Sequence, residues 1–276
     1  MEFDGEGQLT SAVNYVTGDV SKKIYRTAGH GEATLSATVS DLMDKNNYTL
    51  SELNLLMNPE IPEDCDLLLM YAPAKDLTEE EKTAVETYLS GGGNVMILLG
   101  DTNATELPNL SALMKTYGLE AADGYIADPQ RAYQGNYYYF FPMLSASGDL
   151  ANGLTSEMVL LANAHGLNLT AAARDTITTE AFMETSQNAF AVTEESQSEG
   201  SYTLGATATE ALDDEKESRL TVISAGSLID AQITDTFTTL ENTTLFMNVV
   251  TANFDDVENV SVEPKSLAVE YNTVQY

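Results

Sequence analysis

The strongest constraint on the fold is a pair of strand-length apolar runs, residues 66–72 and 95–99, separated by one well-marked helix. Runs that are apolar at consecutive positions are typical of strands buried on both faces of a parallel sheet. Between them, Thr78 and Glu81 form the pattern of a capping box, and the glycines at 91–93 end the helix. A buried strand, a helix and a second buried strand in this order predict a parallel β-α-β unit.

The same alternation extends over residues 22–118. Strands are expected at 23–28 and 48–56, with a helix between them that ends near residue 46, and a last helix is expected at 110–117. We therefore expect an α/β fold with an open, mostly parallel sheet and helices on both faces.

The second half is less regular, and we expect it to contain a β-rich insertion at 125–215 within a single α/β domain of residues 1–276. A buried strand at 220–225 and an amphipathic helix at 240–250 are expected to rejoin the first sheet. The remaining expectations are a helix at 9–16, short strands at 159–162, 176–183, 189–193 and 202–208, and polar loops or hairpin tips at 196–201 and 213–217.

Charge excludes several functions. The 43 acidic and 12 basic residues give a formal net charge of −31, which repels nucleic acid and anionic membrane surfaces. Solubility explains this charge most simply, and cation binding by clustered carboxylates is the alternative. The single cysteine, Cys65, cannot form an internal disulfide, and no Cys/His spacing suits zinc, so no metal is expected. No signal peptide is recognisable, and no apolar run approaches 18 residues, so the chain is expected to be soluble.

The turn Gly29-His30-Gly31-Glu32 follows an apolar run and precedes an amphipathic stretch. It is therefore expected at the carboxyl edge of the sheet, where α/β folds bind their ligands.

Three stretches carry a resemblance to a known family. They are the turn Gly29-His30-Gly31-Glu32 with the preceding residues 5–20, the series from Ile61-Pro62 through Tyr71-Ala72-Pro73 to Tyr88-Leu89-Ser90-Gly91-Gly92, and Leu245-Phe246-Met247-Asn248-Val249 followed by Pro264-Lys265-Ser266-Leu267. In this order they resemble the extracytoplasmic domain of the GldG-like auxiliary components of ABC-type transport systems, the group first named from gliding motility.

The resemblance implies a fold related to class I glutamine-amidotransferase-like and flavodoxin-like proteins, without an assigned activity. It also implies a bacterial protein anchored by membrane segments absent from this chain, with residues 267–276 leading toward the membrane. Its partners would be the permease and ATPase subunits of the transporter. The resemblance implies no catalytic residue and no cofactor.

Hydrolase motifs are missing from the sequence. An amidotransferase needs a cysteine at a strand-to-helix elbow, and the candidate elbows at Ala72 and Gly100 carry no nucleophile. Cys65 precedes its strand and so lies at the wrong edge. There is no Gly-x-Ser-x-Gly motif and no ATP-binding P-loop.

Two histidines remain as candidate acid/base groups or ligands. His30 and Glu32 could converge on a ligand together with Asp101. The structural alternative, which we favour, is that His30 bonds to a nearby loop and Glu32 caps the next helix. His165 is expected to be a loop residue, and the aromatic cluster at 133–141 is expected to pack under a loop rather than stack on a ligand.

Together these observations predict a non-catalytic extracytoplasmic domain that binds a partner subunit, a substrate or an envelope component. The alternatives are a metal- or acid/base-dependent hydrolase using His30 and Glu32, and a dimerising spacer with an exposed apolar patch. The ligand crevice is expected at the following residues: Gly29, His30, Gly31, Glu32, Ala72, Pro73, Gly100 and Asp101.

Overall fold

The computed structural model describes residues 2–3, 21–156, 158–213, 216–254 and 265–266. The helix expected at 9–16 and the closing residues 267–276 lie outside the described residues.

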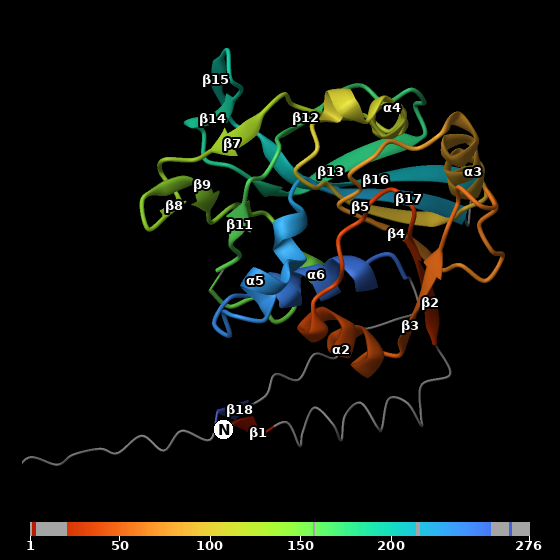
Figure 1. Ribbon diagram of the computed structural model, residues 1–276, viewed down its shortest axis with the longest axis horizontal. Helices are drawn as coiled ribbons and strands as arrows, with labels where there is room; N and C mark the ends of the chain where they lie inside the picture. The colour runs from red at the N-terminus through yellow and green to blue at the C-terminus, as the bar shows by residue number, and fades with distance from the viewer. Residues whose placement is uncertain (1, 4–20, 157, 214–215, 255–264, 267–276) are drawn as a thin grey trace, which may run out of the picture.

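A large mixed sheet organises the fold (Figure 1). Eight strands follow one another in space: β10 (Met143–Leu144), β13 (Ile177–Glu184), β16 (Thr203–Asp213), β17 (Lys216–Ile223), β5 (Asn94–Leu98), β4 (Leu67–Tyr71), β2 (Lys22–Thr27) and β3 (Tyr48–Leu53). Two short strands extend this sheet: β12 (Leu167–Leu169) pairs with β16, and β6 (Leu119–Ala121) pairs with β12.

Five neighbouring strands, from β17 through β5, β4 and β2 to β3, run parallel. Taken in chain order as one to five, they are arranged 2-1-3-4-5, which is the flavodoxin-like order. The strand expected at 220–225 does rejoin the first sheet, because β17 pairs with β5 from Arg219 opposite Asn94 to Ile223 opposite Leu98.

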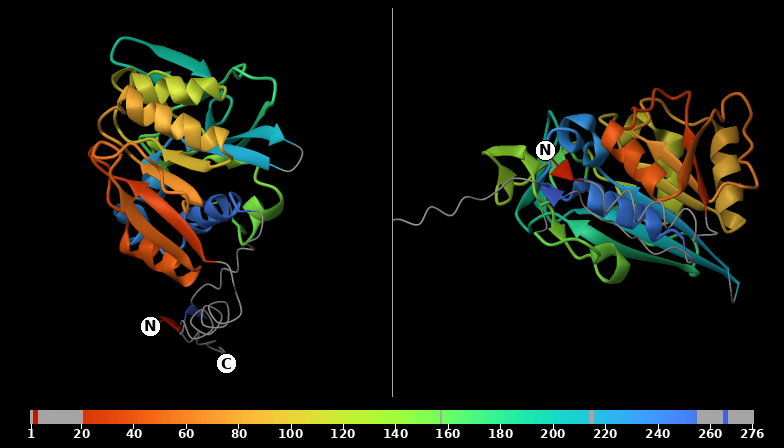
Figure 2. Two further views of the ribbon diagram at one scale, coloured as in Figure 1. Left: turned by 90° about the vertical axis from the view of Figure 1, so that its right-hand side faces the viewer. Right: turned by 90° about the horizontal axis from the view of Figure 1, so that it is seen from below.

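The remaining main strands are antiparallel to their neighbours. β16 and β17 form a long hairpin whose far end projects past the rest of the sheet (Figure 2). Because β13 and β16 pair with the main sheet, much of the segment 125–215 is continuous with it; whether this segment is an insertion remains a prediction.

The helices are α2 (Ala37–Lys45), α3 (Glu79–Ser90), α4 (Pro108–Thr116), α5 (Ala231–Thr234) and α6 (Asn242–Thr251), with short 3-10 helices η1 (Ala104–Glu106), η2 (Gly148–Ala151) and η3 (Gly226–Ile229). The capping box predicted for α3 is present, with Thr78 and Glu81 each bonding to the other's backbone. The cap predicted for the next helix was wrong: Ser36, not Glu32, caps α2, by accepting a hydrogen bond from Val39 N. Among the helices of the described ranges, none has the length and apolar stretch that crossing a bilayer requires.

Alternate side chains of the central strands enter two different hydrophobic clusters. Leu67 and Leu69 of β4 pack with buried side chains of α2 and α6. Leu68 and Met70 of the same strand pack with buried side chains of α3 and α4. This alternation explains why β4 is apolar at every position: both of its sides are covered.

Smaller sheets complete the described chain. One contains β8 (Ala132–Tyr133), β9 (Asn136–Phe140) and β11 (Leu161–Ala162), and another contains β7 (Tyr125–Ala127), β14 (Ala189–Val192) and β15 (Gln197–Gly200). A third pairs β1 (Glu2–Phe3) with β18 (Lys265–Ser266). The polar loop or hairpin tip expected at 196–201 was wrong, because residues 197–200 form the edge strand β15. Its residues are polar and mostly exposed, so they show no apolar alternation that would indicate a strand.

Candidate functional site

A pocket of about 380 Å³ lies at the carboxyl ends of three adjacent parallel strands, β4, β5 and β17. Ala72 follows β4, Gly100 follows β5 after one residue, and Gly226 and Ser227 follow β17; all four line the pocket. This is the edge of the sheet where α/β folds bind ligands.

Small residues meet at the base of the pocket. Ala72 has a left-handed backbone, with φ of 49°. A Cβ atom on Gly100 would lie 3.0 Å from the Ala72 Cβ, and a Cβ atom on Gly226 would lie 3.2 Å from it. Beneath them, the Tyr71 hydroxyl donates to the Gly226 carbonyl at 3.2 Å. Burial, followed by the negative charge of Asp230, raises the pKa of Tyr71, so its hydroxyl stays protonated and can keep donating.

One wall of the pocket is aromatic. Tyr133 and Tyr139 come from the β8–β9 hairpin, and Phe237 comes from the segment after α5. The rings of Tyr133 and Phe237 are nearly perpendicular, with centroids 6.4 Å apart. The expectation that the aromatic cluster packs under a loop was therefore wrong in part: Tyr139 is 38% exposed and lines the pocket, and its neighbours Tyr137 and Tyr138 are also exposed.

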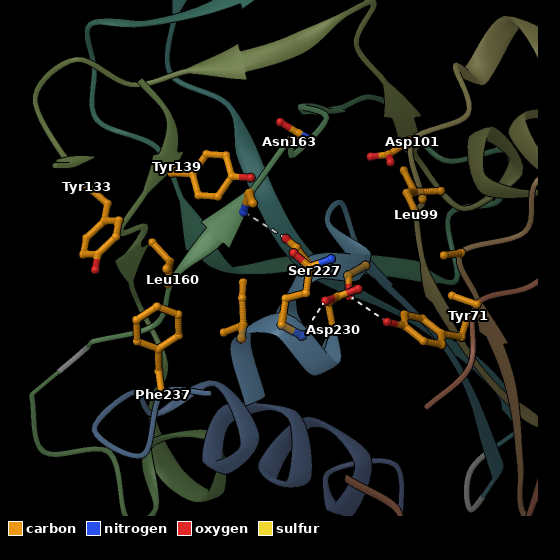
Figure 3. Close-up of a pocket in the computed structure, with 17 residues that line it drawn as sticks. Tyr71, Leu99, Asp101, Tyr133, Tyr139, Leu160, Asn163, Ser227, Asp230 and Phe237 are labelled. Atoms are coloured by element: carbon orange, nitrogen blue, oxygen red, sulfur yellow. Dashed lines mark hydrogen bonds between the residues drawn. The ribbon is translucent and has the colours of Figure 1, made fainter. Parts of the chain in front are cut away.

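The polar side chains of the pocket are Asp101, Asn163, Ser227, Asp230 and Gln232. Ser227 Oγ accepts a hydrogen bond from Ala162 N at 2.9 Å, and Asp230 Oδ1 accepts one from Gln232 N at 2.7 Å. Figure 3 shows the rings of Tyr133, Tyr139 and Phe237 toward the left of the view, Asp230 near the centre and Asp101 at the upper right. No lysine, arginine or histidine lines this pocket in the part of the chain that the structure describes.

A buried histidine holds the part of the pocket formed by Gly100 and Asp101. His165 lies in a loop, as expected, and is 2% exposed. Its Nε2 lies 3.0 Å from the Gly100 carbonyl and its Nδ1 lies 2.8 Å from the Gly124 carbonyl. Tyr125 stacks on the imidazole and donates its hydroxyl to the Asp101 carbonyl at 2.8 Å. These contacts fix the backbone that carries Asp101.

The predicted turn forms a second, separate cluster. His30 Nδ1 lies 3.3 Å from Glu32 Oε1, and His30 Nε2 lies 3.1 Å from Glu81 Oε2 in α3. All three side chains are at most 5% exposed. The Glu32 carboxylate also accepts a hydrogen bond from the His30 backbone N at 2.8 Å.

The charges in this cluster stabilise one another. The hydrogen bond that His30 donates to the Glu32 carboxylate is the main cause that raises the pKa of His30, against the opposing effect of burial. Burial alone would raise the pKa of Glu32, but the hydrogen bonds from His30, the local backbone and Thr27 outweigh it and lower this pKa to about 2. Below the ordinary histidine pKa of 6.5, His30 and Glu32 therefore face each other as a buried ion pair.

The chain itself closes the crevice between β2 and β4. Ala33 N donates to the Tyr71 carbonyl at 3.1 Å, and Ala74 N donates to the His30 carbonyl at 2.9 Å. In the 2-1-3-4-5 order this is the point where the strand sequence reverses and where flavodoxin-like folds hold their ligand. Here backbone hydrogen bonds and the His30 cluster occupy that position.

The structure therefore assembles only part of the predicted crevice. Ala72, Gly100 and Asp101 line the pocket. The following predicted residues are not among those that line it: Gly29, His30, Gly31, Glu32 and Pro73. Sequence reasoning missed the aromatic wall and Asp230, although the Gly226-Ser227 pair after a buried strand and the tyrosine-rich run were visible signals.

Other predicted groups lie apart from the pocket. Cys65 is buried before β4, and burial raises its pKa to about 11, so the thiol is protonated at neutral pH. Among the described residues, no group of three His, Cys, Asp or Glu side chains could hold a metal ion.

Three solved structures are similar to this chain. The mmIFT52 N-terminal domain has a TM-score of 0.64 at 15% identity, covering 86% of this chain and 100% of that one. A ThuA-like protein from Bacteroides uniformis has a TM-score of 0.53 at 11% identity, covering 84% and 91%. A cytoplasmic protein from Salmonella typhimurium has a TM-score of 0.52 at 9% identity, covering 84% and 98%.

At these identities the likeness establishes the fold alone, and the ThuA-like neighbour confirms the expected amidotransferase-like fold. No curated protein matches the sequence. The sequence profile of one family matches residues 21–249, well over half of the chain. The chain therefore belongs to the family described as an ABC-type uncharacterized transport system.

Proposed function

We propose that this chain is a non-catalytic binding domain of an ABC transport system, working on the extracytoplasmic face of a bacterial membrane. It holds a small ligand in the pocket at the carboxyl ends of β4, β5 and β17. Family membership supports the link to transport, and the shape and lining of the pocket support binding. The gliding-motility-type proteins that the sequence resembles are its expected functional relatives.

One observation carries the choice of binding over catalysis. Ala72 occupies the turn directly after β4 with a left-handed backbone, at the position where a nucleophile elbow would carry its attacking group, but it presents a methyl group to the pocket. Ser227, the serine that lines the pocket, accepts a hydrogen bond from Ala162 N at its Oγ, and no described lining residue is a histidine that could act as its base.

The same geometry weakens the hydrolase alternative. His30 and Glu32 bond to each other and, through His30, to Glu81 inside the protein, whereas Asp101 lines the pocket. These groups do not converge on one open cavity, so they cannot act together on a substrate.

ATP hydrolysis would belong to another subunit, because the sequence has no P-loop. The partners in this proposal are the permease and ATPase subunits, reached through the full-length protein.

The test starts from the full-length protein isolated from its own membranes in mild detergent. We expect the ATPase and permease to co-elute with it, and heat denaturation to release a small molecule detectable by mass spectrometry. Tyr139→Ala should lose this molecule. Tyr138→Ala is the matched control, because Tyr138 is adjacent, 37% exposed against 38%, and does not line the pocket.

Loss of the molecule from both variants, or its absence from the wild-type protein, would contradict ligand binding in this pocket. Elution without any transporter subunit would contradict the partner assignment. Turnover of the released molecule by the purified chain would show an enzyme.

A further inference from the structure

The pocket combines two carboxylates with the aromatic wall of Tyr133, Tyr139 and Phe237 and, among the described lining residues, no basic side chain. We propose that its ligand is a small organic cation, an ammonium group carried on an apolar body. This inference rests on the proposed function, because it names the class of ligand for the same pocket.

The aromatic wall suits the cationic group. Tyrosine and phenylalanine rings attract cations through their negative faces, and the attraction is stronger where water is excluded. Tyr133 and Tyr139 come from one hairpin, and Phe237 comes from a distant segment that meets Tyr133 edge to face. A ligand that enters between these rings and the strand ends loses much of its hydration on the aromatic side.

The carboxylates determine the sign of the ligand charge. Asp101 and Asp230 both line the pocket, and the whole chain carries a formal charge of −31. An anionic ligand would enter against this field without a basic group to receive it. A cation is drawn in by the same field and meets the carboxylates at short range.

The size and remaining lining exclude a bare metal ion. A volume of about 380 Å³ lies in the range of small-molecule sites. Leu160 and Ile233 add apolar surface, which a hydrated metal ion does not use. The side chains of Asn163 and Gln232 supply neutral amides, which can form hydrogen bonds with a hydroxyl or carbonyl group of the ligand.

Choline and 3,3-dimethyl-1-butanol provide the sharpest probe pair, because they have the same shape and differ in the charge of the central atom. Isothermal titration of the purified chain should show choline binding at least about tenfold more tightly than the neutral alcohol. Nα-acetyl-lysinamide serves as a third probe, since it presents an ammonium group as a protein side chain would.

The variants locate the binding. Asp101→Asn and Tyr139→Ala should each weaken choline binding by about tenfold. Asp41→Asn, on the exposed surface of α2, and Tyr138→Ala are the matched controls and should leave it unchanged.

The inference is overturned if choline does not bind, if the two isosteres bind equally, or if the Asp41→Asn control weakens binding as much as Asp101→Asn. Preference for Nα-acetyl-lysinamide over choline would overturn the small-molecule part of the proposal, because the occupant would then be a lysine side chain of a protein and not a free organic cation. If the neutral alcohol binds better and Tyr139→Ala abolishes that binding, this inference fails while the proposed function stands. Absence of any heat-released ligand would make the proposed function itself fail.

Discussion

Replacing Glu32 with glutamine should destabilise the protein in a pH-dependent manner. Glutamine keeps the size of the side chain but removes the charge that pairs with His30. The pKa of Glu32 falls from an ordinary 4.5 to about 2 in the folded protein. Because one pKa unit corresponds to roughly 1.4 kcal/mol, the charged carboxylate contributes about 3 kcal/mol to stability.

The sign of the pH dependence follows from the direction of each shift. A lowered carboxyl pKa gives stability that is present above about pH 4.5 and is lost as the pH falls toward 2. The raised pKa of His30 gives stability that is present below its ordinary value of 6.5 and is lost as the pH rises through the folded value. The His30–Glu32 contact contributes to both shifts, so it is counted once, and the loss should be largest between about pH 4.5 and 6.5.

Urea unfolding of the wild-type and Glu32→Gln proteins at several pH values measures this difference. We expect about 3 kcal/mol at pH 5.5, shrinking below pH 4.5. Glu60→Gln is the matched control, because Glu60 is exposed, and it should change stability by less than about 0.5 kcal/mol. A difference below about 1 kcal/mol at pH 5.5, or one that stays constant down to pH 3, would refute the assignment of a buried ion pair.

Two further predictions concern the backbone. Thr78→Ala should lower the free energy of unfolding by about 1 kcal/mol, because it removes the capping box of α3. The control Thr83→Ala, at an exposed position of the same helix, should lower it much less. Equal losses of stability in urea unfolding would contradict the role of the cap. Gly124→Ala should be far more destabilising than Gly135→Ala. Both glycines have φ near +80°, but a Cβ atom would lie 2.1 Å from the Val192 carbonyl oxygen at Gly124 and would meet nothing within 4 Å at Gly135. Thermal unfolding should show a cost of about 1 kcal/mol for Gly135→Ala and several times that for Gly124→Ala, and similar melting temperatures would disprove the steric argument.

The parallel part of the sheet was predictable because its signals are local. A fully buried strand is apolar at every position, and a capping box can be read from Thr78 and Glu81 directly. The predicted strand and helix ends differ from the observed ones by only a few residues; the strand expected at 48–56, for example, ends at Leu53.

The site was predictable only where it depends on strand order. Ala72, Gly100 and Asp101 line the pocket because they follow buried strands. His30 was misplaced, because its partner Glu81 is 51 positions away and pairing over that distance leaves no local pattern. Tyr139 and Phe237 were not predicted as pocket residues for the same reason: tertiary contacts bring them to the strand ends, and sequence periodicity does not show such contacts.

Closing the strand-reversal point with backbone hydrogen bonds has a consequence for how recognition could diversify in this fold. Backbone hydrogen bonds already join the ends of β2 and β4, so the sheet does not need a bound ligand at that point. The side chains that line the neighbouring pocket can therefore vary without disrupting the fold of the sheet. The outer boundary of the pocket belongs to the β8–β9 hairpin, which can vary in length and composition while the strands beneath it stay constant. Homologous domains could then share one framework and accept chemically unrelated guests.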